Sequence, residues 1–590
     1  MSQPPIHTPL TQLESADLIR RLVEAELAYS FKHNLIQETA YSSLLKNDRR
    51  TLHRVCAQTL EKLYADQLDE YAALLAQHYA EAGNDTKTLT YTLRAGQVAA
   101  RRYAHLEALM QFDSARAVAQ REPCSPEQLL ELYTARGRSL EMIGRQNDAV
   151  ENYMELRTLA HARGDESLEL AALLPLATLY ATPNIAQDLD KARELNMEAL
   201  ERARAVKNQQ AEARVLWNLM LGAYFTGQPQ LALEYGEQGI ALARALNLRE
   251  QLAFLLNDIS RVYIGNAAPE KGIAALDEAR TIFQEFDNLP MLADNLASTA
   301  DALSTVGQFD AALDLAKQAD ELAQRIGNSW NRAYSAMISL LVYFQRGEAS
   351  LALDLAARVE PIAKESGFLI AVVASRIVQA TVYGYLGAPE RGIQLLQSPF
   401  PVPTEAIQLV QAWMTSILAY LYVLNNDLAA ARAAVAQAHQ EMVGDDLSTL
   451  SPAMVALSEA ELLLAEKRPA EVLQIIPSLL ERMERTGIYI YLADLYYLYG
   501  QALYDLEKFD QAEQILNKGR QIGEKLTARP ALISILGTLA AIANTRNQME
   551  RANALRQEAR AYAEYIAAHA PPEFRESFYN TLPVRALLET

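Results

Sequence analysis

Cysteine is scarce in this sequence, and the residues that build catalytic or metal sites are scattered. Only Cys56 and Cys124 occur among 590 residues, which is too few for a disulfide framework and fits a reducing compartment. The eight histidines show no metal-ligand spacing, and no H-E-x-x-H, C-x-x-C or G-x-S-x-G string occurs. We therefore predict no enzymatic activity, no catalytic residue, no metal and no cofactor.

Long apolar runs and an excess of positive charge are also missing. No run of 18 apolar residues occurs, so we expect no membrane span and no membrane partner. The start of the sequence is polar and rich in proline, unlike a signal peptide. The net charge of −19 disfavours general nucleic-acid binding. We expect a soluble, cytoplasmic protein for which nucleic acid is not a partner.

What the sequence does contain is a small residue that recurs every 39–43 positions inside helical patterns. We call this series the ladder; its members are Ala149, Ala192, Ala232, Gly272, Ala312, Ala352, Gly392, Ala431, Val472, Ala512 and Ala552. A period of this length is typical of solenoid repeats, and small residues let paired helices approach closely. We predict an all-α superhelical solenoid of about twelve helix hairpins. They resemble tetratricopeptide (TPR) repeats, which have 34 residues, with a longer period of about 40.

The chain divides into five predicted segments. A loose lead-in with three prolines spans 1–13, and a winged-helix-like helical block spans 14–66, with a short strand at Leu27–Phe31. The first, irregular helix pairs occupy 67–125. The repeat array occupies 126–570, with a proline-rich break at 398–404 that we expect to cut one helix short. A tail follows at 571–590.

The first helix of each repeat is expected to line the concave surface, where solenoids bind ligands. Aromatic residues mixed with Asn, Gln, Arg and Asp suit a protein or peptide ligand there, although the large aromatics could equally be core residues. The ladder register predicts these partner-binding residues: Trp217, Tyr224, Asn257, Arg261, Asp301, Tyr334, Phe344, Trp413, Tyr420, Tyr497, Gln501 and Tyr504.

The block before the array resembles a known family. The strings YSFKHNLIQETAYSSLL from Tyr29, RRTLHR from Arg49 and ALLAQHY from Ala73 are similar to the helical arm of bacterial STAND-class signalling ATPases. In that family the arm follows the ATPase core and leads into a long TPR-like array. The strings PPEFRESF from Pro571 and LPVRALL from Leu582 are similar to the ends of such chains. The phosphate-binding string G-x-x-x-x-G-K-[ST] does not occur, so the sequence looks like the sensor part without its ATPase.

The resemblance implies a function and one further site residue. A histidine at the start of such a block reads the bound nucleotide diphosphate, so His33 could do so with an ATPase partner; the alternative is a partly buried histidine that caps the following helix. We predict a non-enzymatic sensor module that binds a protein, peptide or other ligand in its groove and contacts an ATPase or effector through the N-terminal block. Alternatives are a free-standing scaffold or adaptor, and the ligand-sensing part of a transcription regulator.

Overall fold

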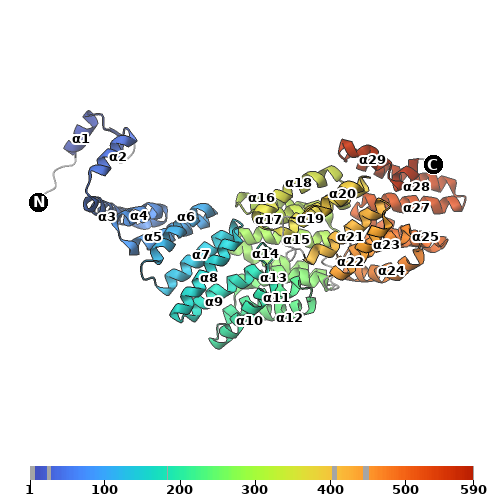
Figure 1. Ribbon diagram of the computed structural model, residues 1–590, viewed down its shortest axis with the longest axis horizontal. Helices are drawn as coiled ribbons and strands as arrows, with labels where there is room; N and C mark the ends of the chain where they lie inside the picture. The colour runs from blue at the N-terminus through green and yellow to red at the C-terminus, as the bar shows by residue number, and fades with distance from the viewer. Residues whose placement is uncertain are drawn as a thin grey trace. The chain divides into compact units, whose positions relative to one another are not determined.

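A computed structural model describes residues 7–22, 28–182, 184–266, 268–400, 408–442 and 451–588. These residues contain 30 α-helices, α1 to α30, and a single two-stranded sheet. The chain divides into two compact units, 1–139 and 140–590. The fold is an all-α solenoid, as predicted, in which helix hairpins follow one another along the chain (Figure 1).

Unit 1 begins with a helix where we expected a loose lead-in. Helix α1 starts at His7 and includes Pro9, which lies in the first turn, where a backbone N–H has no helical partner and proline costs little. The predicted strand is present from Tyr29 and pairs antiparallel with Ile19–Arg21; Leu27 lies outside the described residues. The elements of this unit are α1 (His7–Ser15), β1 (Ile19–Arg21), β2 (Tyr29–Phe31), α2 (Asn34–Ser43), α3 (Lys46–Leu63), η1 (Ala65–Gln67), α4 (Leu68–Ala82), α5 (Asp85–Arg101), α6 (His105–Ala119) and α7 (Pro126–Met142).

Unit 2 is the regular array, in which odd-numbered helices are the first and even-numbered helices the second of each hairpin. Its elements are α8 (Gln146–Arg163), α9 (Glu166–Ala181), α10 (Leu189–Ala205), α11 (Gln209–Phe225), α12 (Pro229–Ala245), α13 (Arg249–Gly265), α14 (Pro269–Glu285), α15 (Leu289–Thr305), α16 (Phe309–Arg325), α17 (Ser329–Gln345), α18 (Ala349–Ser366), α19 (Leu369–Tyr385), α20 (Pro389–Gln397), α21 (Gln408–Leu424), α22 (Leu428–Glu441), α23 (Ser451–Ala465), α24 (Pro469–Thr486), α25 (Leu492–Asp505), α26 (Phe509–Leu526), α27 (Arg529–Thr545), α28 (Met549–Ala568), η4 (Pro572–Phe574), α29 (Arg575–Tyr579) and α30 (Leu582–Leu588).

The ladder residues hold the second helices close to their neighbours. The alanines of the ladder are buried, and Val472 is fully so. A Cβ at Gly272 would lie 2.6 Å from the carbonyl oxygen of Ser260, and one at Gly392 would lie 2.7 Å from that of Ala380. At both positions the second helix lies directly against the backbone of the first helix, so only glycine fits. This confirms that close helix packing is the reason for the small residues.

Two of the predicted irregularities fall at least partly within the described residues. Helix α20 ends after nine residues at Gln397, and Ser398 is extended, so the proline cluster does cut this helix short; residues 401–407 lie outside the described ranges. The segment expected as a tail, 571–590, forms η4, α29 and α30 as far as Leu588, and α30 packs against α27 and α28. Phe574, Phe578 and Leu587 are buried there.

Successive turns of the superhelix touch within unit 2. The amide of Tyr489 donates to the carbonyl of Thr305 at 2.8 Å, and that of Ser350 donates to the carbonyl of His569 at 2.9 Å. Three side-chain hydrogen bonds to backbone carbonyls join residues 183–220 positions apart: Arg529 to Arg346 at 2.8 Å, Ser577 to Leu386 at 2.7 Å and Gln146 to Ser366 at 3.3 Å. With a period of about 40 residues, one superhelical turn takes roughly five repeats.

The turn glycines make this contact possible. Gly307 has a φ of +79°, which favours glycine. A Cβ at that position would lie 2.5 Å from Leu526 and 3.0 Å from Tyr489, both on the next superhelical turn. Glycine at position 307 therefore allows both the positive φ of the turn and the close approach of the next superhelical turn.

Candidate ligand-binding surface

Two columns of residues recur at fixed positions on the first helices of unit 2, and we call the side of these helices that carries them the inner face. Asp294, Tyr334, Trp413 and Asp494 stand 18 residues before a ladder residue, and Arg261, Asp301, Tyr420, Glu461 and Gln501 stand 11 residues before one. The two columns are seven residues apart, which is two helical turns on the same face. Their side chains form two clusters on neighbouring parts of the array.

The first group, which we call the arginine cluster, consists of Asp258, Arg261, Asp294, Asp301 and Tyr334. It joins α13, α15 and α17. Arg261 Nη2 donates to the hydroxyl of Tyr334 at 3.3 Å. Burial raises the pKa of all three carboxyls, that of Asp294 to about 6, and Arg261 partly offsets this. The charge of Arg261 thus acts on three carboxyl groups, and that of Arg214 acts on Asp258 as well.

Neighbouring donors fix the carboxyls of the arginine cluster. The indole Nε1 of Trp217 donates to Asp258 at 2.8 Å, and the amide of Asn257 donates to Asp294 at 2.8 Å. Asn257 is in turn held by Asn295, whose amide donates to its side-chain oxygen at 3.0 Å. Both Asn257 and Asn295 are fully buried. This network keeps the charged atoms in place on the inner face before any ligand is bound.

The second group, which we call the tyrosine–carboxyl cluster, consists of Tyr385, Tyr420, Glu461, Asp494 and Tyr497. It joins α19, α21, α23 and α25. Burial raises the pKa of Asp494 to about 7; burial and the nearby Asp494 raise the pKa of Glu461 to about 7. The field of both carboxyls also acts on Tyr420, which is near Tyr385 and Tyr497.

Aromatic rings extend the tyrosine–carboxyl cluster. The ring of Phe344 lies 6.2 Å from that of Tyr385 and 6.5 Å from that of Tyr491. Tyr491 shares a hydrogen bond with Gln345. These residues come from α17 and from the turn before α25, so the cluster is walled by aromatic side chains from several repeats.

Most of the residues predicted from the ladder register lie in or beside these clusters. Trp217, Tyr224, Asn257, Arg261, Asp301 and Tyr334 belong to the surroundings of the arginine cluster, where Tyr224 acts on the pKa of Arg261. Phe344, Tyr420 and Tyr497 belong to those of the second cluster.

Four predicted residues lie outside the two clusters. Gln501 accepts a hydrogen bond from Thr538 at 2.7 Å. Trp413 packs in the hydrophobic core with 5% of its surface exposed. Tyr504 packs against Phe509, 5.6 Å away, at the turn of its hairpin. His33 lies in unit 1 as an exposed N-cap of α2, and its side chain makes no capping hydrogen bond.

Five residues of the clusters were missed from the sequence: Asp258, Asp294, Tyr385, Glu461 and Asp494. Asp294, Asp494 and Glu461 occupy the same repeat positions as Tyr334 and Arg261, which were predicted. Counting back from the ladder in every repeat, without regard to residue type, would have found these three.

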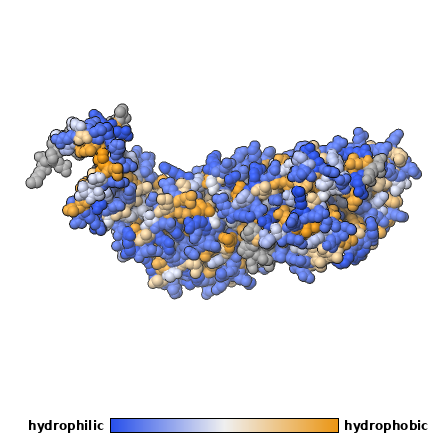
Figure 2. All heavy atoms as spheres, turned by 45° about the horizontal axis from the view of Figure 1, so that its top comes forward, coloured by the Kyte–Doolittle hydropathy of each residue, from blue (hydrophilic) through white to orange (hydrophobic). Residues whose placement is uncertain are grey.

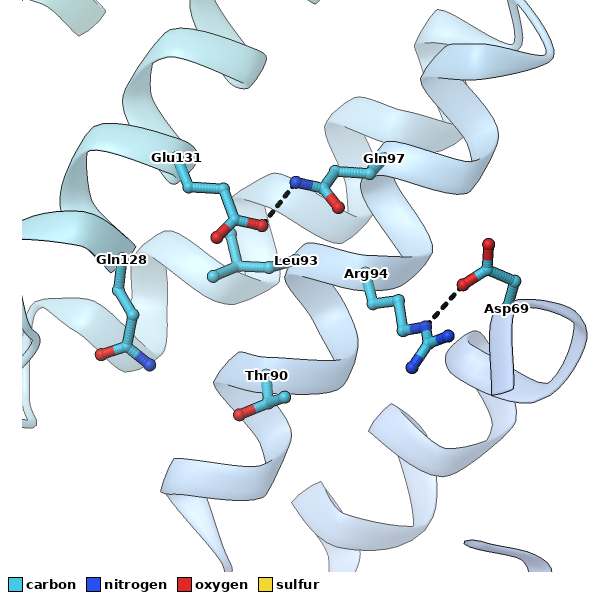
Figure 3. A pocket seen from close by; sticks show the side chains of 7 residues that line it. All are labelled: Asp69, Thr90, Leu93, Arg94, Gln97, Gln128 and Glu131. Carbon is cyan, nitrogen blue, oxygen red and sulfur yellow. Dashed lines mark hydrogen bonds and ion pairs between the residues drawn. The ribbon is translucent and has the colours of Figure 1, made fainter. Parts of the chain in front are cut away.

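Unit 1 contains a separate small cavity of about 310 Å³ (Figure 3). It is lined by α4, α5 and α7 through Asp69, Thr90, Leu93, Arg94, Gln97, Gln128 and Glu131. Arg94 Nε is paired with Asp69 at 2.5 Å, and the amide of Gln97 donates to Glu131 at 2.5 Å (Figure 3). Because its charged groups are already paired with one another, this cavity is a weaker candidate than the inner face of unit 2.

The described part of the chain contains neither a metal-binding arrangement nor a membrane-spanning helix. No group of three or more His, Cys, Asp or Glu residues there is arranged to hold a metal ion. Among the helices in the described ranges, none is both long and apolar enough to cross a bilayer.

Comparison with known proteins assigns no family. No family model matches the sequence. An uncharacterized protein of Rhizobium meliloti is 35% identical over 100 residues, which are 17% of this chain. The chain thus spans about a tenth of the length of that relative.

Solved structures with some likeness are helical-repeat proteins. A STAND-class ATPase with a TPR sensor from Pyrococcus horikoshii has 15% identity and a TM-score of 0.40, over 67% of this chain and 57% of that one. A Rap protein complexed with competence and sporulation factor has 11% identity and a TM-score of 0.40, over 74% and 98%. The APC/C hetero-tetramer Cut9-Hcn1 has 14% identity and a TM-score of 0.42, over 93% and 99%. Scores this low transfer no function to the chain.

Proposed function

We propose that unit 2 is a non-enzymatic binding module that holds a segment of protein or peptide along its inner face. The observation that carries the proposal is the set of partly buried carboxyl, guanidinium and phenol groups on that face. Burying a charge is costly, and a repeat array needs only apolar contacts between neighbours to be stable. The cost of keeping these groups is explained if they recognise a ligand.

The composition of the inner face favours a polypeptide ligand. Tyrosine and tryptophan supply large contact areas with few rotatable bonds, and carboxyls with fixed donors beside them can pair with backbone amides and basic side chains. A polyanion such as a nucleic acid would instead meet three carboxyls around Arg261 and be repelled.

A peptide display library tests this function. Full-length protein is immobilised, and peptides are selected from a random twelve-residue library. We expect enrichment of a sequence pattern that Arg261→Met and Tyr334→Phe weaken at least tenfold. Lys317→Ala is the matched control, because Lys317 is highly exposed on the second helix α16. Absence of enrichment, or equal loss in the control, would refute the proposal.

The finer proposal is that this module is the sensor part of a STAND-class ATPase system, with the N-terminal block of unit 1 contacting the ATPase. Two observations support it. The sequence strings within residues 29–80 resemble the helical arm of that family, and a group of apolar side chains is exposed in the same segment. Leu35, Leu45, Leu52 and Val55 on or beside α2 and α3 are 74%, 74%, 50% and 52% exposed, and Figure 2 shows orange apolar atoms near the N-terminal end among a mostly hydrophilic surface. Apolar surface of this kind commonly marks an interface.

A co-expression experiment tests the finer proposal. A phosphate-binding-loop ATPase encoded beside this chain would be co-purified with it, and Leu45→Ser with Leu52→Ser should abolish the complex. Leu582→Ser is a matched control, since Leu582 is 75% exposed but lies in unit 2. If no such ATPase is encoded nearby, or the complex survives the double substitution, the scaffold alternative is favoured.

A further inference from the structure

The tyrosine–carboxyl cluster differs from the arginine cluster in one respect: its negative charge has no positive partner. Among the described residues, no Lys, Arg or His acts on the pKa of Glu461 or Asp494, and neither carboxyl forms an ion pair. In the arginine cluster, by contrast, Arg261 acts on all three carboxyls. The chain therefore leaves a place for one positive charge at this point of its inner face.

The walls of the cluster suit an organic cation. The charges of both carboxyls act on Tyr420, that of Glu461 on Tyr497 and that of Asp494 on Tyr491. Phe344 extends the aromatic surface toward Tyr385, whose ring lies 6.2 Å away. Aromatic faces attract ammonium and guanidinium groups, more strongly when water is excluded. A metal ion is less suited, because no group of three or more His, Cys, Asp or Glu residues in the described part of the chain is arranged to hold one.

Two buried donors without partners point to a second part of the ligand. The hydroxyl of Tyr385 and the indole Nε1 of Trp413 have no hydrogen-bond partner among the described residues. Trp413 is 5% exposed and lies seven residues before Tyr420 on the same face of α21. Trp413 also holds the repeat position that Asp494 holds in α25. Both donors need an acceptor such as a backbone carbonyl, because a buried donor left unpaired is costly.

We propose that the tyrosine–carboxyl cluster binds a lysine or arginine side chain of the peptide that occupies the inner face, with Glu461 and Asp494 as counter-charges and Tyr385 and Trp413 as donors to backbone carbonyls of the peptide. This inference rests on the proposed function of unit 2 and adds the chemical class of the ligand at one position.

The ionisation of the cluster supports the proposal and gives it a second readout. The groups on which the two carboxyls act are Tyr420 from α21, Tyr491 at the start of α25 and Tyr497 within α25. All are phenols with raised pKa values and stay neutral near pH 7. Only the two carboxyls, with pKa values of about 7, titrate there. A bound cation needs one of them ionised, so binding should release a proton.

A positional-scanning library of eight-residue peptides tests the inference on the full-length protein at pH 8. In each sub-library one position is fixed as Lys, Arg, norleucine or Glu. We expect the wild-type protein to prefer Lys or Arg at one position by at least tenfold over norleucine. The double variant Glu461→Gln and Asp494→Asn should lose that preference and keep the preferences at other positions. Glu321→Gln is the control that should keep it, because Glu321 is 66% exposed on the second helix α16 and lies outside both clusters.

The outcomes separate the two proposals. No binding of any sub-library by the wild-type protein refutes the proposed function, and the inference with it. Binding without a basic preference, or a basic preference that survives in the double variant, refutes the inference alone. Each carboxyl is also replaced singly, so that a folding defect in one variant does not decide the result. For the wild-type protein, we expect the basic preference to be about tenfold stronger at pH 8 than at pH 6, since one proton with a pKa near 7 is released; a preference equal at both pH values contradicts the assignment.

Discussion

Replacing Asp494 with asparagine should stabilise helix α25, and only at neutral and alkaline pH. The pKa of Asp494 is raised from 3.8 to about 7 by burial. The folded protein therefore holds this proton more tightly than the unfolded chain does. The contribution to stability is fully present below pH 3.8 and is lost as the pH rises through 7. Asparagine has nearly the same shape and does not titrate, so the variant avoids this loss.

The size of the effect follows from the shift. About three pKa units at about 1.36 kcal/mol each give about 4 kcal/mol as an upper bound. The side chain is partly accessible to solvent and its titration is linked to that of Glu461, so we expect about half of this, about 2 kcal/mol at pH 8. In amide hydrogen exchange, which reports local opening, that is about thirtyfold slower exchange of α25 in Asp494→Asn than in the wild-type protein.

Exchange should be measured at pH 4.5 and pH 8 and corrected for the intrinsic rate. The gap between variant and wild type should be several times smaller at pH 4.5. Asp505→Asn is the matched control, because Asp505 is exposed on the same helix, and it should change exchange little at either pH. A gap that does not depend on pH, or a variant that exchanges faster at pH 8, would show that Asp494 is not held as a buried, uncompensated acid.

Three further outcomes follow from the contacts described above or from unit 1. Gly307→Ala should lower the midpoint of thermal unfolding measurably, because the added Cβ is strained by the positive φ and clashes with the next superhelical turn. Gly327→Ala has a φ of +68° and no atom within 4 Å of the added Cβ, so it should cost only about 1 kcal/mol. Equal losses in the two variants would contradict the turn contact. Trp217→Phe removes the donor to Asp258, and chemical denaturation should show a loss of about 1–3 kcal/mol; no loss would mean that water replaces the indole. In unit 1, burial disfavours the charge of Glu61, but hydrogen bonds from a lysine and two tyrosines outweigh burial and lower the pKa of Glu61 to about 2. The contribution of Glu61 to the free energy of unfolding, about 2 kcal/mol after discounting for solvent, is present above pH 4.5 and lost as the pH falls toward 2. Glu61→Gln should remove this acid-sensitive part in a pH series of melting curves.

The array could be predicted from the sequence because its cause is local and repeated. Each small ladder residue marks a place where two helices must approach closely, and Gly272 and Gly392 show that contact directly. The lead-in was predicted incorrectly because Pro9 was treated as a helix breaker, although in the first turn of α1 it replaces an N–H that has no partner.

The inner face was only partly predictable. The first helices pack on several sides, so apolar residues surround them and the hydrophobic pattern does not show which side faces inward. Aromatic residues such as Tyr334 and Tyr420 were therefore found, while Glu461 and Asp494 were not, because carboxyls in a helix are usually on the outer, solvated surface. The contacts between superhelical turns could not be predicted from the sequence. They join distant residues such as Arg346 and Arg529, and their positions depend on the small rotation between neighbouring repeats, summed over several repeats.

The touching turns of unit 2 also limit how a ligand can arrive. In a superhelix whose turns do not contact one another, neighbouring turns can separate and a folded partner can enter between them. Here hydrogen bonds such as Tyr489 to Thr305 and Ser577 to Leu386 would have to break before neighbouring turns could separate. Under the proposed function, a chain end or an unfolded segment could reach the inner face without breaking these bonds, whereas a compact domain entering between the turns could not. If the proposed function holds, the contacts between turns would favour ligands that are extended.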